Sequence, residues 1–219
     1  MVNNQPQGYF ITSQSGNGNP ILVLHAWWGL NDTIKDFCKR LAESGYSVFA
    51  PDLYHGKIAQ TIPEAEILGR GVDENPEKAK AEVEQAARFL IEKSGNKNSG
   101  LAVIGFSLGA YYALELAAAL PETVKAVVLF YGTGPVDLSK SRASFLGHYA
   151  ENDDYEPASN VDKQEEYLKK LGRPVTFYRY PGTGHWFFEP DRPQNYDKKA
   201  AELAWSRTLA FLQESFSAR

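Results

Sequence analysis

Short apolar runs alternate with longer amphipathic stretches from residue 21 onward, and this alternation constrains the fold more than any other feature. The apolar runs have the length of buried strands, whereas the amphipathic stretches place apolar residues at helical spacing. The expected strands are Ile21–Ala26, Tyr46–Ala50, Leu101–Phe106, Val124–Tyr131, Ser144–Ala150 and Pro174–Tyr180. The expected helices are one between Asn31-Asp32 and Gly45, then Pro76–Lys93, Leu108–Leu120, Asp162–Leu171 and Asp197–Phe216. Helical crossovers of this length predict an α/β fold with a mainly parallel central sheet and helices on both faces.

Length and charge narrow the class of protein further. The 219 residues fit one domain better than two, since a domain holds roughly 150 residues. A net charge of −4 argues against nucleic acid or an anionic membrane as a partner. The first residues lack the pattern of a signal peptide, and no run approaches the ~18 apolar residues of a membrane span. We therefore expect a single-domain, cytoplasmic protein.

The sequence shows no pattern that is typical of a metal site. Cys38 is the one cysteine, which rules out an intramolecular disulfide and disfavours a cysteine-based metal site. The sequence has no H-x-x-x-H or similar ligand cluster, which disfavours a metallohydrolase. We expect no metal and no cofactor.

One long segment, Leu53–Asn75, shows no clear helix or strand pattern. Its proline and its glycines at 56, 69 and 71 are typical of irregular backbone. We expect a flap or lid loop beside the site, and the alternative is a surface insertion without a role.

A serine motif, Gly105-Phe106-Ser107-Leu108-Gly109, lies between a predicted strand and a predicted helix. In this context G-x-S-x-G is typical of a nucleophile on a sharp strand-to-helix turn. The glycines remove collisions that side chains would make, and the turn lifts the hydroxyl toward the positive end of the helix. The alternative is a glycine-rich turn with an ordinary capping serine. The pattern favours Ser107 as a nucleophile.

A serine hydroxyl needs a base to remove its proton, and the chain has four histidines. His25 and His148 belong to predicted core strands, which is typical of structural histidines, and His55 lies in the irregular segment. His185 follows a predicted strand in a glycine turn, and its place after Ser107 matches the chain order nucleophile, acid, base. His185 is therefore the predicted base.

The third group required is a carboxylate that orients the imidazole, and it should follow a strand between Ser107 and His185. Asp153 and Asp154 come directly after a predicted strand. Asp137, in the loop after the preceding strand, is a weaker candidate. Spacing does not distinguish Asp153 from Asp154.

An ester hydrolase also needs two N–H donors for the oxyanion of the tetrahedral intermediate. One is expected from Leu108, the residue after the nucleophile, and the other from the loop after the first core strand. That loop contains Trp27 and Trp28. Adjacent tryptophans are costly as pure surface, so we expect them to line a pocket; the alternative is packing against the neighbouring loop.

Four segments together resemble a known family. In chain order they read His-Ala-Trp-Trp-Gly-Leu-Asn, Ala-Pro-Asp-Leu-Tyr-His-Gly, Gly-Phe-Ser-Leu-Gly-Ala and Gly-Thr-Gly-His-Trp-Phe-Phe. They are similar to segments of the dienelactone hydrolases, a branch of the α/β-hydrolases, from about Ile21 to the terminal helix. The resemblance implies an α/β-hydrolase fold in one domain over residues 1–219. It also implies cleavage of an enol-lactone or related ester without metal or cofactor.

The same resemblance implies roles for particular residues. The acid of the family lies four residues before a proline, so Pro157 selects Asp153 over Asp154. The second oxyanion donor of the family corresponds to the N–H of Trp27. Family members are compact monomers, so we expect a monomer, with a dimer as the alternative.

Two substitutions separate this chain from the family pattern around the nucleophile. Dienelactone hydrolases carry cysteine where this chain has Ser107, and a glutamate that helps to activate the thiol where it has Ala26. The changes agree with each other, because a serine activated by His185 has no use for the partner of a thiol.

The residues after His185 depart from the family as well. The family uses arginines to hold the carboxylate of dienelactone, one of them a few residues beyond the histidine. Here that stretch reads Trp186-Phe187-Phe188-Glu189, which is apolar and then acidic. This argues against an anionic lactone, although Arg70 and Arg192 are alternative arginines.

These patterns together predict a serine hydrolase that cleaves a small ester or lactone through an acyl-enzyme. The candidates for an apolar pocket are Trp27, Trp28, Tyr111, Tyr155 and Trp186. Two other functions stay open. One is a catalytically silent ligand-binding protein on a hydrolase scaffold, and the other is an acyltransferase or perhydrolase that uses the same acyl-enzyme.

Overall fold

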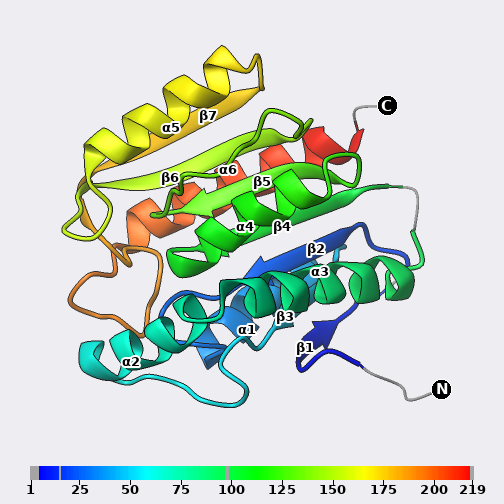
Figure 1. The fold of residues 1–219 in the computed structure, drawn as a ribbon, viewed down its shortest axis with the longest axis horizontal. Coiled ribbons are helices and arrows are strands. Elements are labelled where there is room, and N and C mark those ends of the chain that lie inside the picture. The colour runs from blue at the N-terminus through cyan, green and yellow to red at the C-terminus, as the bar shows by residue number, and fades with distance from the viewer. Residues whose placement is uncertain (1–4, 15, 97–98, 218–219) are drawn as a thin grey trace.

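The structure, a computed structural model, describes residues 5–14, 16–96 and 99–217. Within them, seven strands form one sheet in the order β1-β3-β2-β4-β5-β6-β7 (Figure 1). The strands are β1 (Gly8–Ile11), β2 (Pro20–Leu24), β3 (Ser47–Pro51), β4 (Leu101–Phe106), β5 (Val124–Phe130), β6 (Ser144–Asn152) and β7 (Val175–Gly184). The helices are α1 (Asp32–Glu43), α2 (Ile62–Asp73), α3 (Pro76–Lys93), α4 (Leu108–Ala119), α5 (Ala158–Lys170) and α6 (Lys198–Ser217). β1 pairs antiparallel with β3, and the other pairs are parallel.

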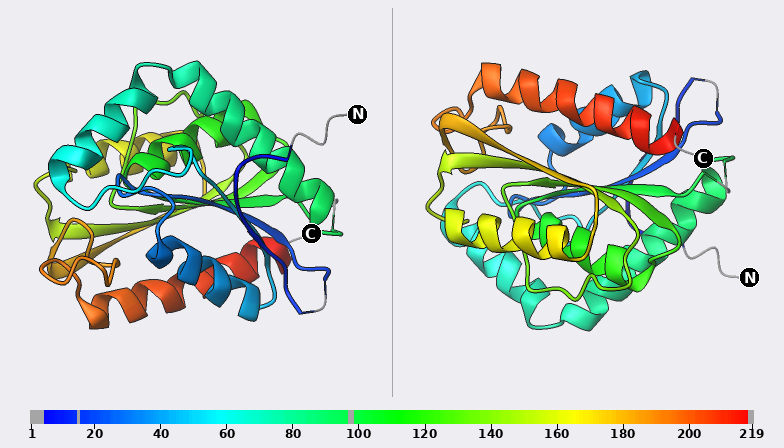
Figure 2. Two further views of the ribbon diagram at one scale, coloured as in Figure 1. Left: turned by 90° about the horizontal axis from the view of Figure 1, so that it is seen from below. Right: turned by 90° about the horizontal axis from the view of Figure 1, so that it is seen from above.

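Helices cover both faces of this sheet (Figure 2). α1 and α6 bury their apolar faces in the core on one side, whereas α3, α4 and α5 bury theirs on the other. The central strands are almost wholly buried, as expected of parallel strands covered on both faces. The predicted single-domain α/β fold with a mainly parallel sheet is therefore confirmed.

The first helix shows how local sequence sets an element. The side chain of Asn31 accepts a hydrogen bond from the Ile34 N–H at 3.1 Å, so it caps α1 as its position predicts. Ile34, Phe37, Cys38 and Leu41 recur at helical spacing and are buried against the sheet. Cys38 is fully buried there, and this burial raises the pKa of its thiol.

The expectation of irregular backbone over Leu53–Asn75 is wrong for its second half, which forms α2. Thr61 and Glu64 form a capping box at the start of the helix, and Pro63 lies in its first turn. Gly69 lies inside α2 where the helix passes close to Trp27. A Cβ at this position would lie 3.0 Å from the Trp27 indole nitrogen, so glycine fits there with the least crowding. The glycines that suggested a loop therefore include one that permits a close helix contact.

The edge strand β1 is an element that the sequence analysis did not predict. It has four residues and pairs with β3 from Gly8–Pro51 to Ile11–Val48. So short a strand carries little periodicity of its own, and its place comes from the exposed edge of β3. In the described part of the chain, no helix is long and apolar enough to cross a membrane.

The topology brings the candidate site residues to one edge of the sheet. Trp27 follows β2, Ser107 follows β4, Asp153 follows β6 and His185 follows β7. Because these strands are parallel, their carboxyl ends lie at the same edge, where ligands bind in open α/β sheets.

Candidate active site

Ser107 occupies a strained turn between β4 and α4. Its backbone angles are φ 49° and ψ −111°, a region that residues with a side chain seldom adopt. Its N–H donates to the Phe130 carbonyl at 2.9 Å, which fixes the turn against β5. A Cβ on Gly105 would lie 2.3 Å from the Gly109 carbonyl oxygen, and one on Gly109 would lie 2.3 Å from that of Leu24. Both glycines are therefore required for the turn to form.

Three side chains from different strand ends form a hydrogen-bonded chain. Ser107 Oγ lies 3.0 Å from His185 Nε2, and His185 Nδ1 lies 2.8 Å from Asp153 Oδ1 and 2.9 Å from Oδ2. A carboxylate only accepts, so Nδ1 carries the proton and Nε2 is left to accept from the Ser107 hydroxyl. The side chains of His185 and Asp153 are each 4% exposed, so water competes little for their bond.

The local backbone holds the Asp153 carboxylate in place. Its Oδ1 accepts the N–H groups of Tyr155 at 2.9 Å and of Glu156 at 2.8 Å. Asp154, which spacing did not separate from Asp153, is exposed, and among the described residues the ion pair of His185 is with Asp153. Asp137 accepts the N–H of Ser139 on an exposed loop. Among these aspartates, the structure brings Asp153 to the imidazole.

The other histidines lie apart from Ser107. His25 is buried, its Nδ1 donates to the Ala26 carbonyl and its Nε2 accepts the Leu53 N–H, and burial lowers its pKa. His148 lies between the hydroxyls of Tyr180 and Thr208, and burial lowers its pKa to about 3. Both are neutral structural residues. His55 is half-exposed beside Glu82.

A cavity of about 240 Å³ opens at Ser107. Trp27 and Leu108, the predicted oxyanion donors, both contribute to its wall. Three of the five predicted pocket residues line it: Trp27, Tyr111 and Tyr155. The full lining consists of Trp27, Ser107, Leu108, Tyr111, Tyr131, Gly132, Thr133, Tyr155, Glu156 and His185.

Trp28 and Trp186, also predicted as pocket residues, do not line this cavity. Their rings pack against each other with centroids 5.1 Å apart, and both residues are buried. The guanidinium of Arg192 lies 3.6 Å over the Trp28 ring and covers it. Of the two adjacent tryptophans, one therefore faces the cavity and the other packs under the loop that follows His185.

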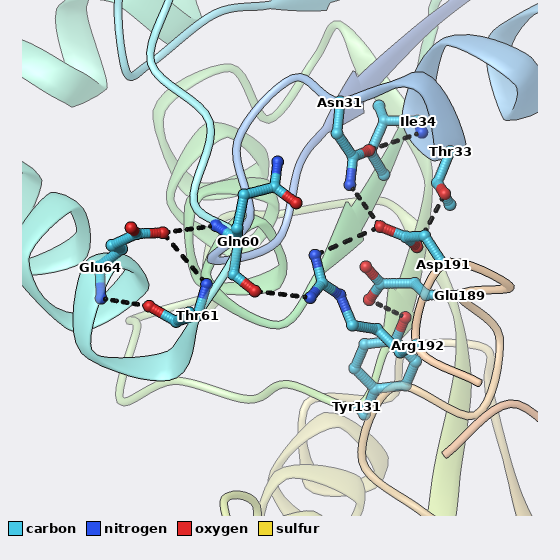
Figure 3. A network of polar contacts seen from close by, with 10 residues as sticks. All are labelled: Asn31, Thr33, Ile34, Gln60, Thr61, Glu64, Tyr131, Glu189, Asp191 and Arg192. Atoms are coloured by element: carbon cyan, nitrogen blue, oxygen red, sulfur yellow. Dashed lines mark hydrogen bonds and ion pairs between the residues drawn. The ribbon is translucent and has the colours of Figure 1, made fainter. Parts of the chain in front are cut away.

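A pair of residues to which the sequence analysis gave no role lies next to the imidazole. Tyr131 follows β5 with φ 38°, and its ring centroid lies 4.8 Å from that of His185. Its hydroxyl donates to Glu189 Oε1 at 2.6 Å (Figure 3). Glu189 is fully buried, and desolvation raises its pKa to about 8. A single sequence carries no signal for this pair, because Tyr131 and Glu189 are 58 residues apart.

The two alternative arginines lie outside the cavity lining. Arg192 donates to the Gln60 carbonyl at 3.3 Å and pairs with Asp191, as Figure 3 shows. Arg70 donates to the Glu66 carbonyl on its own helix. In the described residues, no group of three or more His, Cys, Asp or Glu side chains is placed to hold a metal ion.

A strained serine at the first turn of a helix, in contact with a histidine that follows the last strand of a mainly parallel sheet, defines the class as an α/β-hydrolase. A model described as "Dienelactone hydrolase family" matches residues 7–216, and the chain belongs to this family. The resemblance inferred from the four sequence segments is therefore confirmed.

Individual relatives agree with this assignment. Protein usf of Aquifex pyrophilus is 31% identical over 215 residues, which cover 95% of this chain and 93% of that protein. A protein of Aquifex aeolicus, named as a candidate carboxymethylenebutenolidase, is 30% identical over 217 residues, or 94% of this chain and 92% of the relative. The solved structure of a candidate dienelactone hydrolase from Klebsiella pneumoniae has the same fold, with a TM-score of 0.81 at 24% identity, covering 97% of this chain and 92% of that one.

Proposed function

We propose that this protein is a serine hydrolase that cleaves a small ester or lactone through an acyl-enzyme intermediate. The observation that carries the proposal is the 3.0 Å contact between Ser107 Oγ and a His185 whose other nitrogen is held by Asp153. A serine hydroxyl becomes an effective nucleophile when an oriented base accepts its proton.

In the first half of the reaction, Ser107 Oγ attacks the carbonyl carbon and its proton passes to His185 Nε2. The carbonyl π electrons move to oxygen, and the tetrahedral intermediate then expels the leaving oxygen, which takes the proton from His185. Asp153 stabilises the imidazolium that forms in between. In the second half, water attacks the acyl carbon, His185 takes its proton and returns it to Ser107 as the acid departs.

The negative oxygen of each tetrahedral intermediate needs donors at the cavity wall. We assign this role to the N–H groups of Leu108 and Trp27, both of which belong to residues that line the cavity. Leu108 is the first residue of α4, so the positive end of the helix dipole adds to its donor. Ala26, where thiol-dependent members of the family carry a glutamate, is 1% exposed and brings no carboxylate to the serine.

The decisive experiment is treatment with a fluorophosphonate, followed by intact mass and peptide mapping. We expect one adduct per chain on Ser107 and none in Ser107→Ala. In that variant kcat for an activated ester should fall by about four to six orders of magnitude at an unchanged melting temperature. Folded protein that takes no label, or turnover that survives Ser107→Ala, would overturn the proposal and favour a ligand-binding protein on this scaffold.

A further inference from the structure

We propose that Glu156 makes the Ser107 cavity select substrates that carry a positive charge, such as the ester of an amino or quaternary ammonium alcohol, or a lactone that carries an ammonium group. This inference rests on the proposed hydrolase function and adds the charge class of the substrate. It starts from one carboxylate in the lining of the cavity, which also contains one tryptophan and three tyrosines.

Hydrogen bonds fix the position of Glu156, but no positively charged side chain in the described part of the chain pairs with its carboxylate. Its Oε2 accepts the Thr133 N–H at 2.7 Å, and its own N–H donates to Asp153. Its Oε1 is buried and has no hydrogen-bond partner among the described residues. Among all the residues that the structure describes, no Lys, Arg or His lies within ion-pair distance of this carboxylate. A carboxylate without a counter-charge favours a cation in the adjoining space.

The aromatic part of the lining has the same preference. Trp27, Tyr111 and Tyr155 line the cavity, and the rings of Trp27 and Tyr155 meet edge to face with centroids 5.9 Å apart. The faces of aromatic rings attract ammonium groups, and tryptophan does so most strongly. The aromatic rings and the Glu156 carboxylate therefore both favour a positively charged ligand in the cavity.

An anionic substrate would find no cation in this lining. None of the lining residues is lysine or arginine. Arg192 is committed to the Trp28 ring and to Asp191. Lys80 lies 3.2 Å from Glu77 and 3.2 Å from Glu115, so two carboxylates already neutralise it. The carboxylate of a dienelactone would instead meet the charge of Glu156.

Three ligands of nearly one shape test the proposal: choline, its neutral isostere 3,3-dimethylbutan-1-ol, and the anion 3,3-dimethylbutanoate. Isothermal titration calorimetry gives the Kd of each. We expect the cation to bind about five-fold or more tighter than the neutral isostere, and the anion to bind worst. Glu156→Gln should remove most of the preference for the cation, because glutamine keeps the acceptor for Thr133 and loses the charge.

Glu115→Gln is the matched control, since Glu115 accepts from the Tyr111 hydroxyl but does not line the cavity. It should leave the ratio of the Kd values unchanged. If Glu156→Gln does not fold, salt replaces it: raising NaCl from about 0.05 M to about 0.5 M should weaken choline binding to wild-type protein and spare the neutral isostere. Equal affinities, a salt-independent ratio, or a ratio that Glu156→Gln leaves intact would overturn the proposal.

Hydrolysis of acetylcholine and of 3,3-dimethylbutyl acetate separates this inference from the proposed function. Turnover of either ester that survives Ser107→Ala overturns the serine mechanism, whatever the binding preference. Turnover that depends on Ser107, together with an affinity ratio insensitive to Glu156, overturns the charge selection alone.

Discussion

Asp153 and Asp154 are adjacent, yet one is 4% exposed at its side chain in contact with His185 and the other faces solvent. Asp153→Asn would place an amide N–H against Nδ1, drive the imidazole proton to Nε2 and remove the acceptor for the Ser107 hydroxyl. We expect kcat/KM for an activated ester to fall by about 10²–10⁴-fold. Asp154→Asn, the matched control, should stay within about two-fold of wild type. The reverse ranking would assign the acid to Asp154.

The buried carboxyl of Glu189 should make the free energy of unfolding depend on pH. Because its pKa is raised from 4.5 to about 8, the folded protein holds the proton over a pH range in which the unfolded chain has lost it. The protonated Glu189 carboxyl therefore contributes fully to the stability of the folded state below pH 4.5, and this contribution is lost as the pH rises through about 8. Within that window the free energy of unfolding should fall by up to about 1.4 kcal/mol per pH unit.

Glu189→Gln tests this dependence, because glutamine resembles the protonated carboxyl and does not titrate. Urea unfolding across the window should give a flatter pH profile for the variant than for wild type. The exposed Glu166→Gln should keep the wild-type slope. A variant profile as steep as that of wild type would show that Glu189 is ionised in the folded state.

At the scale of an element, α2 passes close to the cavity wall, because a Cβ on Gly69 would lie only 3.0 Å from the Trp27 indole nitrogen. Gly69→Leu should displace either the helix or Trp27, and kcat/KM for an activated ester should fall by about ten-fold, since small displacements at a reacting centre are costly. Gly71→Leu on the same helix is the control, as a Cβ there meets nothing within 4 Å. Equal kinetics for the two variants would contradict a role for α2 in placing Trp27.

The predictable elements share a physical property. Pro76–Lys93, which has an apolar face at helical spacing, and Leu101–Phe106, which is a continuous apolar run, were predicted with their observed bounds, because burial of their apolar residues decides both elements. α2 was missed although Thr61-x-x-Glu64 marks its start, because its glycines outweighed the capping box. β1 was missed because its pairing with β3, and not its own sequence, makes it a strand.

At the scale of the whole molecule, Arg192 connects segments that are far apart in sequence. Its guanidinium covers Trp28, reaches the Gln60 carbonyl before α2 and pairs with Asp191, which in turn accepts from Asn31 at the start of α1. Arg192→Ala should lower the free energy of unfolding by about 1–3 kcal/mol in urea titration. Arg142→Ala, whose ion pair with Glu122 is exposed, should cost less than about 0.5 kcal/mol. Similar losses in both would contradict the connecting role of Arg192.

The site was predictable to the extent that chain order and flanking elements define it. Ser107 and His185 each follow a strand, and the structure brings them within hydrogen-bond distance. The residues around them were not predictable, because Tyr131 meets Glu189, and Thr133 meets Glu156, only through the packing of segments that are far apart in sequence. The Trp27-Trp28 pair shows the same limit: composition indicated a pocket, but only the fold decides which ring faces it.

The burial of Cys38 has a consequence for oxidation. A thiolate nucleophile is converted by peroxide to sulfenic and higher acids, whereas an alcohol is inert to this chemistry. Here the candidate nucleophile is an alcohol, and the one sulfhydryl of the chain is sealed under α1 with its pKa raised, so it offers no accessible thiolate. With Ser107 as the proposed nucleophile, we therefore expect activity to survive peroxide and thiol-alkylating reagents that would inactivate an enzyme whose nucleophile is a cysteine.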